Sequence, residues 1–230
     1  MSFDIAAIQH LYRANETYAI QGNAYQLPVN DVYSSIWDTG GIDVISASNA
    51  TASVTIDLRP APLVGVNAGG FISSAANVNG GFTIANGVVI EDMVGSSYAD
   101  ILMGNQRAND LAAGGGTDTL IGGGGADTLT GADSTELLPG YSEYDTLTGG
   151  DGADTFALGD SFGAYYQDFG FATITDFDWI EVDKIQVFGT SSDYTIENID
   201  NSTDIYFQDD LIGSITNTND VLLSFDFEFA

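Results

Sequence analysis

The sequence predicts an all-β fold, a parallel β-roll of stacked nine-residue units that follows a short N-terminal helix and ends in a C-terminal β cap. Three observations predict it. A nine-residue register runs unbroken over 95–157, its eighth position is always apolar, and its first half is rich in glycine. Glycine permits tight turns, and a regularly spaced apolar residue suits short strands that face one core.

The register contains seven units, and all but one of them begin with glycine. The third and fourth units read AGGGTDTLI and GGGGADTLT. The units begin at Gly95, Gly104, Ala113, Gly122, Gly131, Gly140 and Gly149. Their sixth positions are Asp100, Asn109, Asp118, Asp127, Glu136, Asp145 and Asp154. Their eighth positions, expected to point inward, are Leu102, Leu111, Leu120, Leu129, Leu138, Leu147 and Phe156.

Turns two units apart are expected to lie side by side, because two units make one coil and strands stack about 4.8 Å apart. The sixth-position pairs that follow are Asp100 with Asp118, Asn109 with Asp127, Asp118 with Glu136, Asp127 with Asp145, and Glu136 with Asp154. The unit GADSTELLP lacks the paired glycines, contains Pro139 and carries the longer Glu136, which predicts weaker sites and a looped-out segment at 131–144.

The pattern G-G-x-G-x-D-x-U-x is typical of the calcium-binding repeats of RTX proteins. Carboxylates and backbone carbonyls from adjacent turns supply only oxygen ligands, which calcium prefers. The sequence therefore predicts several bound Ca²⁺ ions. Extracellular calcium modules have dissociation constants of about 0.1–1 mM. We therefore expect the chain to fold outside the cell and to stay unfolded at cytosolic calcium concentrations.

Composition limits the partners. The 230 residues include 33 acidic and 4 basic ones, for a net charge of −29, yet 44% are hydrophobic, so a core can form once the charge is neutralised. Nucleic acid is disfavoured, because phosphate binding needs clustered basic residues. No run reaches the roughly 18 apolar residues of a membrane span, so no membrane insertion is expected. The absence of cysteine excludes a thiolate zinc site and a disulfide framework.

Outside the repeats, the apolar spacing predicts a helix over 3–13, and 14–30 is polar and irregular. Strands are expected at 42–47, 52–58, 87–91, 172–176, 184–188, 193–196, 204–207 and 211–215, with a final strand near Phe225, Phe227 and Phe229. The last two of the numbered ranges should form a hairpin. The chain divides into a helix and lead-in (1–32), a β flank (33–94), the repeats (95–157), and a cap with an export signal (158–230).

Four segments resemble serralysin-type metalloproteases and together cover most of 4–189. They are DIAAIQHLYRAN (4–15), YSSIWDTGGIDVISAS (33–48), IANGVVIEDMVGSSYADILMGN (84–105) and ATITDFDWIEVDKIQVFG (172–189). They resemble the last helix of the family's catalytic domain and the flanks of its C-terminal β-roll. The resemblance implies a right-handed RTX roll, export by an ABC-type (type I) exporter, and an extracellular bacterial location.

The resemblance also implies calcium ligands, mostly carbonyls from the second and fourth positions of the repeats. The glycines concerned are Gly114, Gly116, Gly123, Gly125, Gly150 and Gly152. A separate site would use Asp38, Gly40, Gly41 and Asp43 with carbonyls near Ile20, Gly22 and Ala24, and Glu91, Asp176 and Asp183 match further acidic ligands. Departures at positions expected to be glycine or small are Ser96, Tyr98, Asn105, Arg107, Tyr141 and Glu143.

The protease of that family is missing here. Its zinc motif, H-E-x-x-H-x-x-G-x-x-H, needs three histidines, and this chain has only His10. We expect a monomeric, non-enzymatic module that folds on extracellular calcium and supports secretion and stability of a serralysin-like protein. The alternatives are a calcium-stabilised adhesion or ligand-binding module, and an enzyme that works from carboxylates such as Asp209 and Asp210. Trp37 and Trp179 are interpreted as packing residues at the ends of the roll.

Overall fold

The computed structural model describes residues 19–218 and 220–230. The helix expected over 3–13 lies outside these residues. Within them the chain is nearly all β, with no α-helix and a single 3-10 turn at Ser191–Asp193. None of the described residues belongs to a helix long and apolar enough to span a bilayer.

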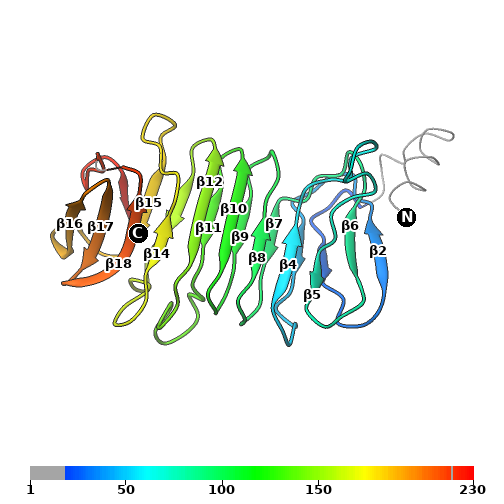
Figure 1. Ribbon diagram of the computed structural model, residues 1–230, viewed down its shortest axis with the longest axis horizontal. Coiled ribbons are helices and arrows are strands. Elements are labelled where there is room, and N and C mark those ends of the chain that lie inside the picture. Colours follow the sequence, from blue (N-terminus) through cyan, green and yellow to red (C-terminus); the bar gives the residue numbers. More distant parts are fainter. Residues whose placement is uncertain (1–18, 219) are drawn as a thin grey trace.

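Two large sheets dominate the molecule, and their strands stack along its long axis (Figure 1). The first sheet is parallel throughout, in the order β1 (Ala24–Gln26), β3 (Val44–Ser46), β7 (Asp92–Val94), β9 (Asp110–Ala112), β11 (Thr128–Thr130), β13 (Thr155–Ala157), β15 (Lys184–Val187) and β19 (Phe227–Phe229). The second sheet has the order β16 (Tyr194–Ile199), β17 (Ser202–Phe207), β18 (Asp210–Thr216), β14 (Ala172–Ile174), β12 (Thr146–Asp151), β10 (Thr119–Gly124), β8 (Ile101–Met103), β4 (Val54–Asp57) and β5 (Ser74–Ala75).

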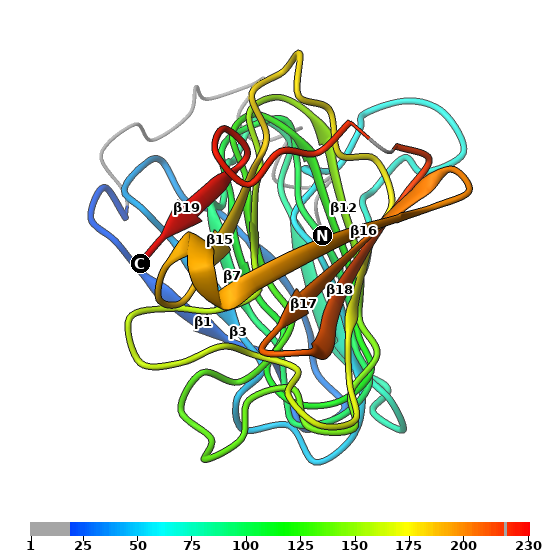
Figure 2. The ribbon, with the colours of Figure 1, turned by 90° about the vertical axis from the view of Figure 1, so that its left-hand side faces the viewer.

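From β7 to β15 successive strands alternate between the two sheets, so that each sheet receives every second repeat unit. The register follows the predicted coil length: Ile101 pairs with Thr119, and Asp110 with Thr128, each 18 residues apart. Viewed along the long axis, the two sheets form opposite walls with the turns at either end (Figure 2). Turns of alternate units therefore lie next to each other, as expected.

The register then changes at the expected weak unit. Thr119 pairs with Thr146 and Thr128 with Thr155, each 27 residues apart, because 131–145 form an irregular loop between β11 and β12. The looped-out segment is confirmed, but three predicted carboxylate pairs are wrong. Asp118 lies opposite Asp145 instead of Glu136, and Asp127 lies opposite Asp154 instead of Asp145.

The core lies between the two walls. Six of the seven eighth-position side chains are fully buried there: Leu102, Leu111, Leu120, Leu129, Leu147 and Phe156. Burying each contributes about 1.5–3 kcal/mol. The prediction for Leu138 is wrong, because the loop that holds it leaves the wall and exposes its side chain. Ile45, Met93 and Ile185 extend the same buried layer beyond the repeats.

Both ends of the molecule depart from the parallel pattern. The C-terminal end is closed by antiparallel strands β16, β17 and β18, and the expected hairpin turns at Gln208 and Asp209, both at positive φ. The N-terminal end carries a separate parallel pair, β2 (Tyr33–Ile36) and β6 (Gly81–Ile84).

Some local predictions fail in these flanks. No strand forms at 87–91, where Val88 and Ile90 are buried in a connection between β6 and β7, and β1 forms inside a segment expected to be irregular. Trp37 packs partly against the core as expected, whereas Trp179 is exposed.

Candidate metal centre

A ladder of buried carboxylates runs through the turns. In each rung, a backbone N–H donates a hydrogen bond to Oδ1 of the aspartate in the next coil of the same wall, and the donor is a sixth-position residue in every rung except the first, where it is Val54. The donors and acceptors, 2.7–2.9 Å apart, are Val54 to Asp100, Asp100 to Asp118, Asn109 to Asp127, Asp118 to Asp145, Asp127 to Asp154, and Asp154 to Asp183. These bonds fix each carboxylate between two adjacent turns.

The second oxygen of several of these carboxylates has no partner. The buried side-chain oxygens that accept no hydrogen bond are Asp43 Oδ2, Asp118 Oδ2, Asp127 Oδ2, Glu143 Oε2 and Asp154 Oδ2. An unsatisfied buried charge is costly, so an aspartate at 1% exposure with a free oxygen needs a proton or a cation. Such oxygens mark where a bound cation would be satisfied.

The glycines predicted to offer carbonyls hold unusual backbone angles. All six, from Gly114 to Gly152, have φ between +99° and +136°. A side chain at Gly116 would bring its Cβ to 2.6 Å from the Tyr98 carbonyl carbon. These turns therefore require glycine, and they hold the backbone of adjacent coils in close contact.

Burial makes the ladder carboxylates poor places for an isolated negative charge. Burial, together with the smaller effect of the negative charge of Asp145, raises the pKa of Asp118 to about 8. It raises the pKa of Asp127 to about 7, with Asp154 adding to the effect. Burial also raises the pKa of Asp183 to about 6. A divalent cation would remove this penalty by compensating the charges directly.

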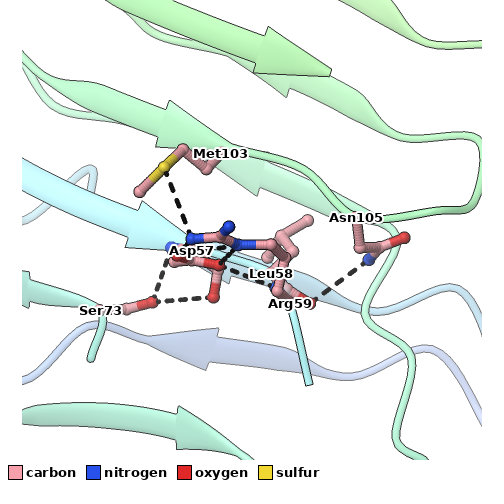
Figure 3. Close-up of polar contacts among 6 residues, drawn as sticks. All are labelled: Asp57, Leu58, Arg59, Ser73, Met103 and Asn105. Atoms are coloured by element: carbon pink, nitrogen blue, oxygen red, sulfur yellow. Dashed lines mark hydrogen bonds and ion pairs between the residues drawn. The ribbon is translucent and has the colours of Figure 1, made fainter. Parts of the chain in front are cut away.

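A buried carboxylate that the chain neutralises by itself provides a contrast. Asp57 is 3% exposed, and the Arg59 guanidinium donates to both of its oxygens, with Nε–Oδ1 at 2.9 Å and Nη2–Oδ2 at 2.6 Å (Figure 3). The Asp57 backbone N–H donates a hydrogen bond to the Ser73 hydroxyl oxygen. This is the only ion pair among the described residues, so no basic side chain forms an ion pair with a ladder carboxylate.

The structure brings the predicted N-terminal ligands together. Asp43 Oδ1 accepts the Asn23 N–H at 2.8 Å, and Asp38 Oδ2 accepts from Asn23 Nδ2 at 3.1 Å. Glu91 Oε2 accepts the Asp43 N–H at 2.9 Å. Burial and the Asp38 charge raise the pKa of Asp43. Gly40 and Gly41 lie beside this cluster at φ +143° and +138°.

Other predicted ligands already have partners in their own chain. Asp100 accepts the Ser96 N–H on Oδ2 at 2.6 Å, and Asn109 uses its amide to bind the Asn105 N–H and the Glu91 carbonyl. Asp176 accepts from the N–H groups of Gly149 and Gly150, and Asp183 Oδ2 accepts from Asp178. These carboxylates and this amide shape the turns, but they leave fewer free oxygens than Asp118, Asp127 and Asp154.

Glu136 does not join the ladder. It lies exposed in the loop between β11 and β12, because the unit that carries it leaves the wall. Sequence reasoning also missed two residues that reach the turns. Glu143 stands where a turn glycine was expected, and its Oε1 accepts the Gly116 N–H at 2.8 Å. Tyr166 is fully buried and donates to Asp145 Oδ2 at 2.6 Å.

The donor set fits a hard cation. Within residues 19–218 and 220–230, no three His, Cys, Asp or Glu side chains come close enough to hold a metal by themselves. Any ion would therefore need backbone carbonyls as well, and the glycine turns supply them beside the free carboxylate oxygens. Six to eight oxygens in a flexible arrangement suit calcium. The residues present thus fit the predicted ion.

Fold and site define a class of protein: parallel β walls, stacked in nine-residue units, with oxygen-lined turns. The chain matches the family described as Peptidase M10 serralysin C terminal over residues 23–228. It belongs to this family, which confirms the resemblance drawn from the sequence.

Three curated relatives show the same likeness over part of the chain. Serralysin of Photorhabdus laumondii subsp. laumondii is 35% identical over 121 residues, covering 47% of this chain and 23% of the relative. Metalloprotease AprA of Pseudomonas entomophila is 37% identical over 121 residues, with the same coverages. Serralysin C of Dickeya chrysanthemi is 35% identical over 113 residues, covering 44% of this chain and 22% of the relative. The chain spans less than a quarter of the length of these relatives.

Proposed function

We propose that this chain is a calcium-binding RTX β-roll, a right-handed solenoid that folds on extracellular calcium. In this role it supports type I secretion and the stability of a serralysin-like protein and is not itself catalytic. Family membership supports the proposal. The observation that carries it is that three buried ladder carboxylates, Asp118, Asp127 and Asp154, each have an Oδ2 without a partner and without a basic counter-charge.

The proposed ligands are the free ladder oxygens and the carbonyls of the positive-φ glycines. Calcium, when bound, would supply positive charge between adjacent coils. The chain's own residues orient the site through the N–H bonds of the ladder and exclude water from it through the buried leucines. The segments 1–32, 33–94, 95–157 and 158–230 are proposed as lead-in, flank, repeats and cap with export signal.

Folding should require calcium, because the net charge of −29 opposes compaction and one site at about 100 times its dissociation constant adds about 2.7 kcal/mol. The test is far-UV circular dichroism in excess EGTA and in about 10 mM calcium, concentrations chosen from the affinity of extracellular modules. A coil spectrum that becomes β on adding calcium is expected. A β spectrum that persists in EGTA at neutral pH would overturn the proposal.

Export is a separate part of the proposal and needs its own experiment. The chain is expressed in bacteria with and without an ABC-type exporter that secretes a serralysin. The culture medium is then tested for the chain by immunoblotting. Release that depends on the exporter and on an intact segment 158–230 is expected. Retention of the chain in cells with an active exporter would contradict the secretion role while leaving the calcium role open to the spectroscopic test.

One observation favours the alternative of a ligand-binding module. A groove of about 410 Å³ crosses the outer face of β7, β9 and β11, and its lining includes the hydroxyl side chains of Ser48, Ser97, Thr130, Ser134 and Tyr165. Hydroxyl groups and Asp110 suit a polar ligand such as a glycan. Glycan-array binding by the calcium-loaded chain that is lost in Thr130→Arg would favour this alternative.

A further inference from the structure

The two walls differ at one pair of carboxylates. On the first sheet, the register places Asp127 opposite Asp154, and both leave Oδ2 without a partner. On the second sheet, Asp118 lies opposite Asp145 and also leaves Oδ2 free, but the Tyr166 hydroxyl donates to Asp145 Oδ2 at 2.6 Å. Tyr166 therefore occupies Oδ2 of Asp145, whereas the equivalent oxygen on the first sheet, Oδ2 of Asp154, is free.

Glu143 supplies an oxygen in the same place. It occupies the fourth position of the turn 140–145, where the regular turns have glycine. Its Oε1 accepts the Gly116 N–H at 2.8 Å, so the side chain reaches across to the turn 113–118 that carries Asp118. Its Oε2 is buried and accepts no hydrogen bond.

Two carboxylate oxygens without partners, Asp118 Oδ2 and Glu143 Oε2, thus belong to side chains at the turn 113–118. Asp118 is 1% exposed, and no basic side chain pairs with either group among the described residues. Burial, together with the smaller effects of the nearby charges of Asp145, Glu136 and Asp133, raises the pKa of Glu143 to about 7. Both groups are better satisfied by a shared cation than by remaining charged and unpaired.

We propose that Glu143 is a calcium ligand that replaces Asp145 in a site shared with Asp118. The proposal rests on the calcium role proposed above. Because Glu143 lies near the end of the loop 131–145, binding an ion here also ties that loop to the turn 113–118. Glu143 departs from the glycine of the sequence pattern, and its carboxylate replaces Asp145 Oδ2, the oxygen to which Tyr166 donates.

The test uses the full chain and calcium itself, titrated by isothermal calorimetry. Glu143→Gln keeps an acceptor for the Gly116 N–H and removes the charge. It should lose one ion, or weaken one site by at least about tenfold, the effect expected for losing one charged ligand. Glu181→Gln is the matched control, because Glu181 Oε2 accepts the Gly152 N–H in the same way at 2.8 Å but is exposed. It should bind calcium like the wild type.

A second variant tests the exchange of oxygens. Tyr166→Phe frees Asp145 Oδ2, so the double variant Glu143→Gln/Tyr166→Phe should regain part of the affinity lost in Glu143→Gln. If Glu143→Gln does not fold, Glu143→Asp keeps the charge on a side chain one methylene shorter and should weaken one site. Unchanged calcium binding in Glu143→Gln, or in Glu143→Asp where that variant is used, overturns the proposal.

The outcomes separate this inference from the wider one. A wild type that binds no calcium ends the proposed function itself. A wild type that binds several ions, with Glu143→Gln binding the same number at the same affinities, ends only the assignment of Glu143. Terbium luminescence sensitised by nearby tyrosines gives an independent count of bound ions for the same variants.

Discussion

A single aspartate in this molecule has two separate tasks, one for each oxygen. Oδ1 of Asp127 accepts the Asn109 N–H at 2.8 Å, which a neutral amide can also do, as Asn109 itself shows when it accepts from Asn105. Oδ2 of Asp127 has no partner. The two tasks can therefore be separated by an isosteric change that keeps the shape and removes the charge.

Asp127→Asn should weaken calcium binding by about tenfold or more, equivalent to about 1.4 kcal/mol, because one charged oxygen is lost. Without calcium, the same variant should form β structure at least as readily as the wild type, since a buried charge has been removed. Isothermal calorimetry measures the calcium affinity, and circular dichroism in EGTA measures the structure that forms without calcium. Asp110→Asn, on the exposed outer face of β9, is the control and should change neither. A tighter calcium midpoint in Asp127→Asn would contradict the assignment.

The pH dependence follows from the same residues. The pKa values in the folded chain, about 6 for Asp183, 7 for Asp127 and 8 for Asp118, lie above the ordinary value of 3.8. The folded, calcium-free state therefore binds more protons than the unfolded state between about pH 4 and 8. Its free energy of unfolding is highest at low pH and falls as pH rises through 6 to 8.

In buffer stripped of calcium by a chelating resin, the β signal should therefore increase as pH is lowered from 8 to 5. The calcium needed to reach a given β signal should fall over the same range, because protons neutralise the buried oxygens that calcium must otherwise neutralise. Circular dichroism at fixed calcium concentrations measures both trends. Calcium-free folding that improves toward pH 8 would contradict the burial of these carboxylates.

At the scale of elements, one repeat unit changes the register between the strands on either side of it, β10 with β12 and β11 with β13. Leu129 and Leu138 occupy the same position of consecutive units, yet Leu129 is fully buried in β11 and Leu138 is 45% exposed in the loop. The chain returns to the wall only at β12, so the coil that contains the loop is one unit longer than the 18-residue coils before it.

Leu129→Ala should therefore lower the free energy of unfolding by about 2–5 kcal/mol, the usual range for a buried leucine. Leu138→Ala should change it by about 0.5 kcal/mol or less, as surface substitutions do. Urea denaturation in saturating calcium compares the two. Equal destabilisation by both variants would indicate that the unit 131–139 packs into the wall after all.

At the scale of the whole molecule, charge and burial act against each other. The net charge of −29 is spread over a chain whose ladder carboxylates lie inside the walls, where dissolved salt does not reach them. Screening by salt acts mainly on exposed charges, whereas buried ones need a bound partner. Neutralisation of this chain should therefore be specific to the ion.

Sodium chloride at about 1 M, where the Debye length is about 3 Å, should not restore the β spectrum in EGTA, whereas about 10 mM calcium should. Hydrodynamic radius by size-exclusion chromatography should fall only with calcium. A compact, β-rich state induced by sodium chloride alone would show that general repulsion, and not the turn oxygens, controls folding.

Much of the fold follows from local pattern. The spacing of glycine and leucine predicted the alternating strands, the inward side chains and the 18-residue coil, and the aromatic-rich tail predicted the closing hairpin and the final strand. The strands missed at the N-terminal end, such as β1 and β6, lie in polar or glycine-rich segments. They form because strands that are distant in the sequence supply their hydrogen-bond partners. The local sequence pattern does not indicate those partners.

The repeat register alone determined which residues turn and which face the core in six of the seven units, because each of these units carries its own turn and strand signals. Which carboxylates meet was decided by tertiary structure, since excluding one unit shifts the partners of Asp118 and Asp127 by nine residues. The roles of Glu143 and Tyr166 were decided there as well. Their side chains reach oxygens and amides far away in the chain, and only the stacking of coils brings those groups within hydrogen-bonding distance.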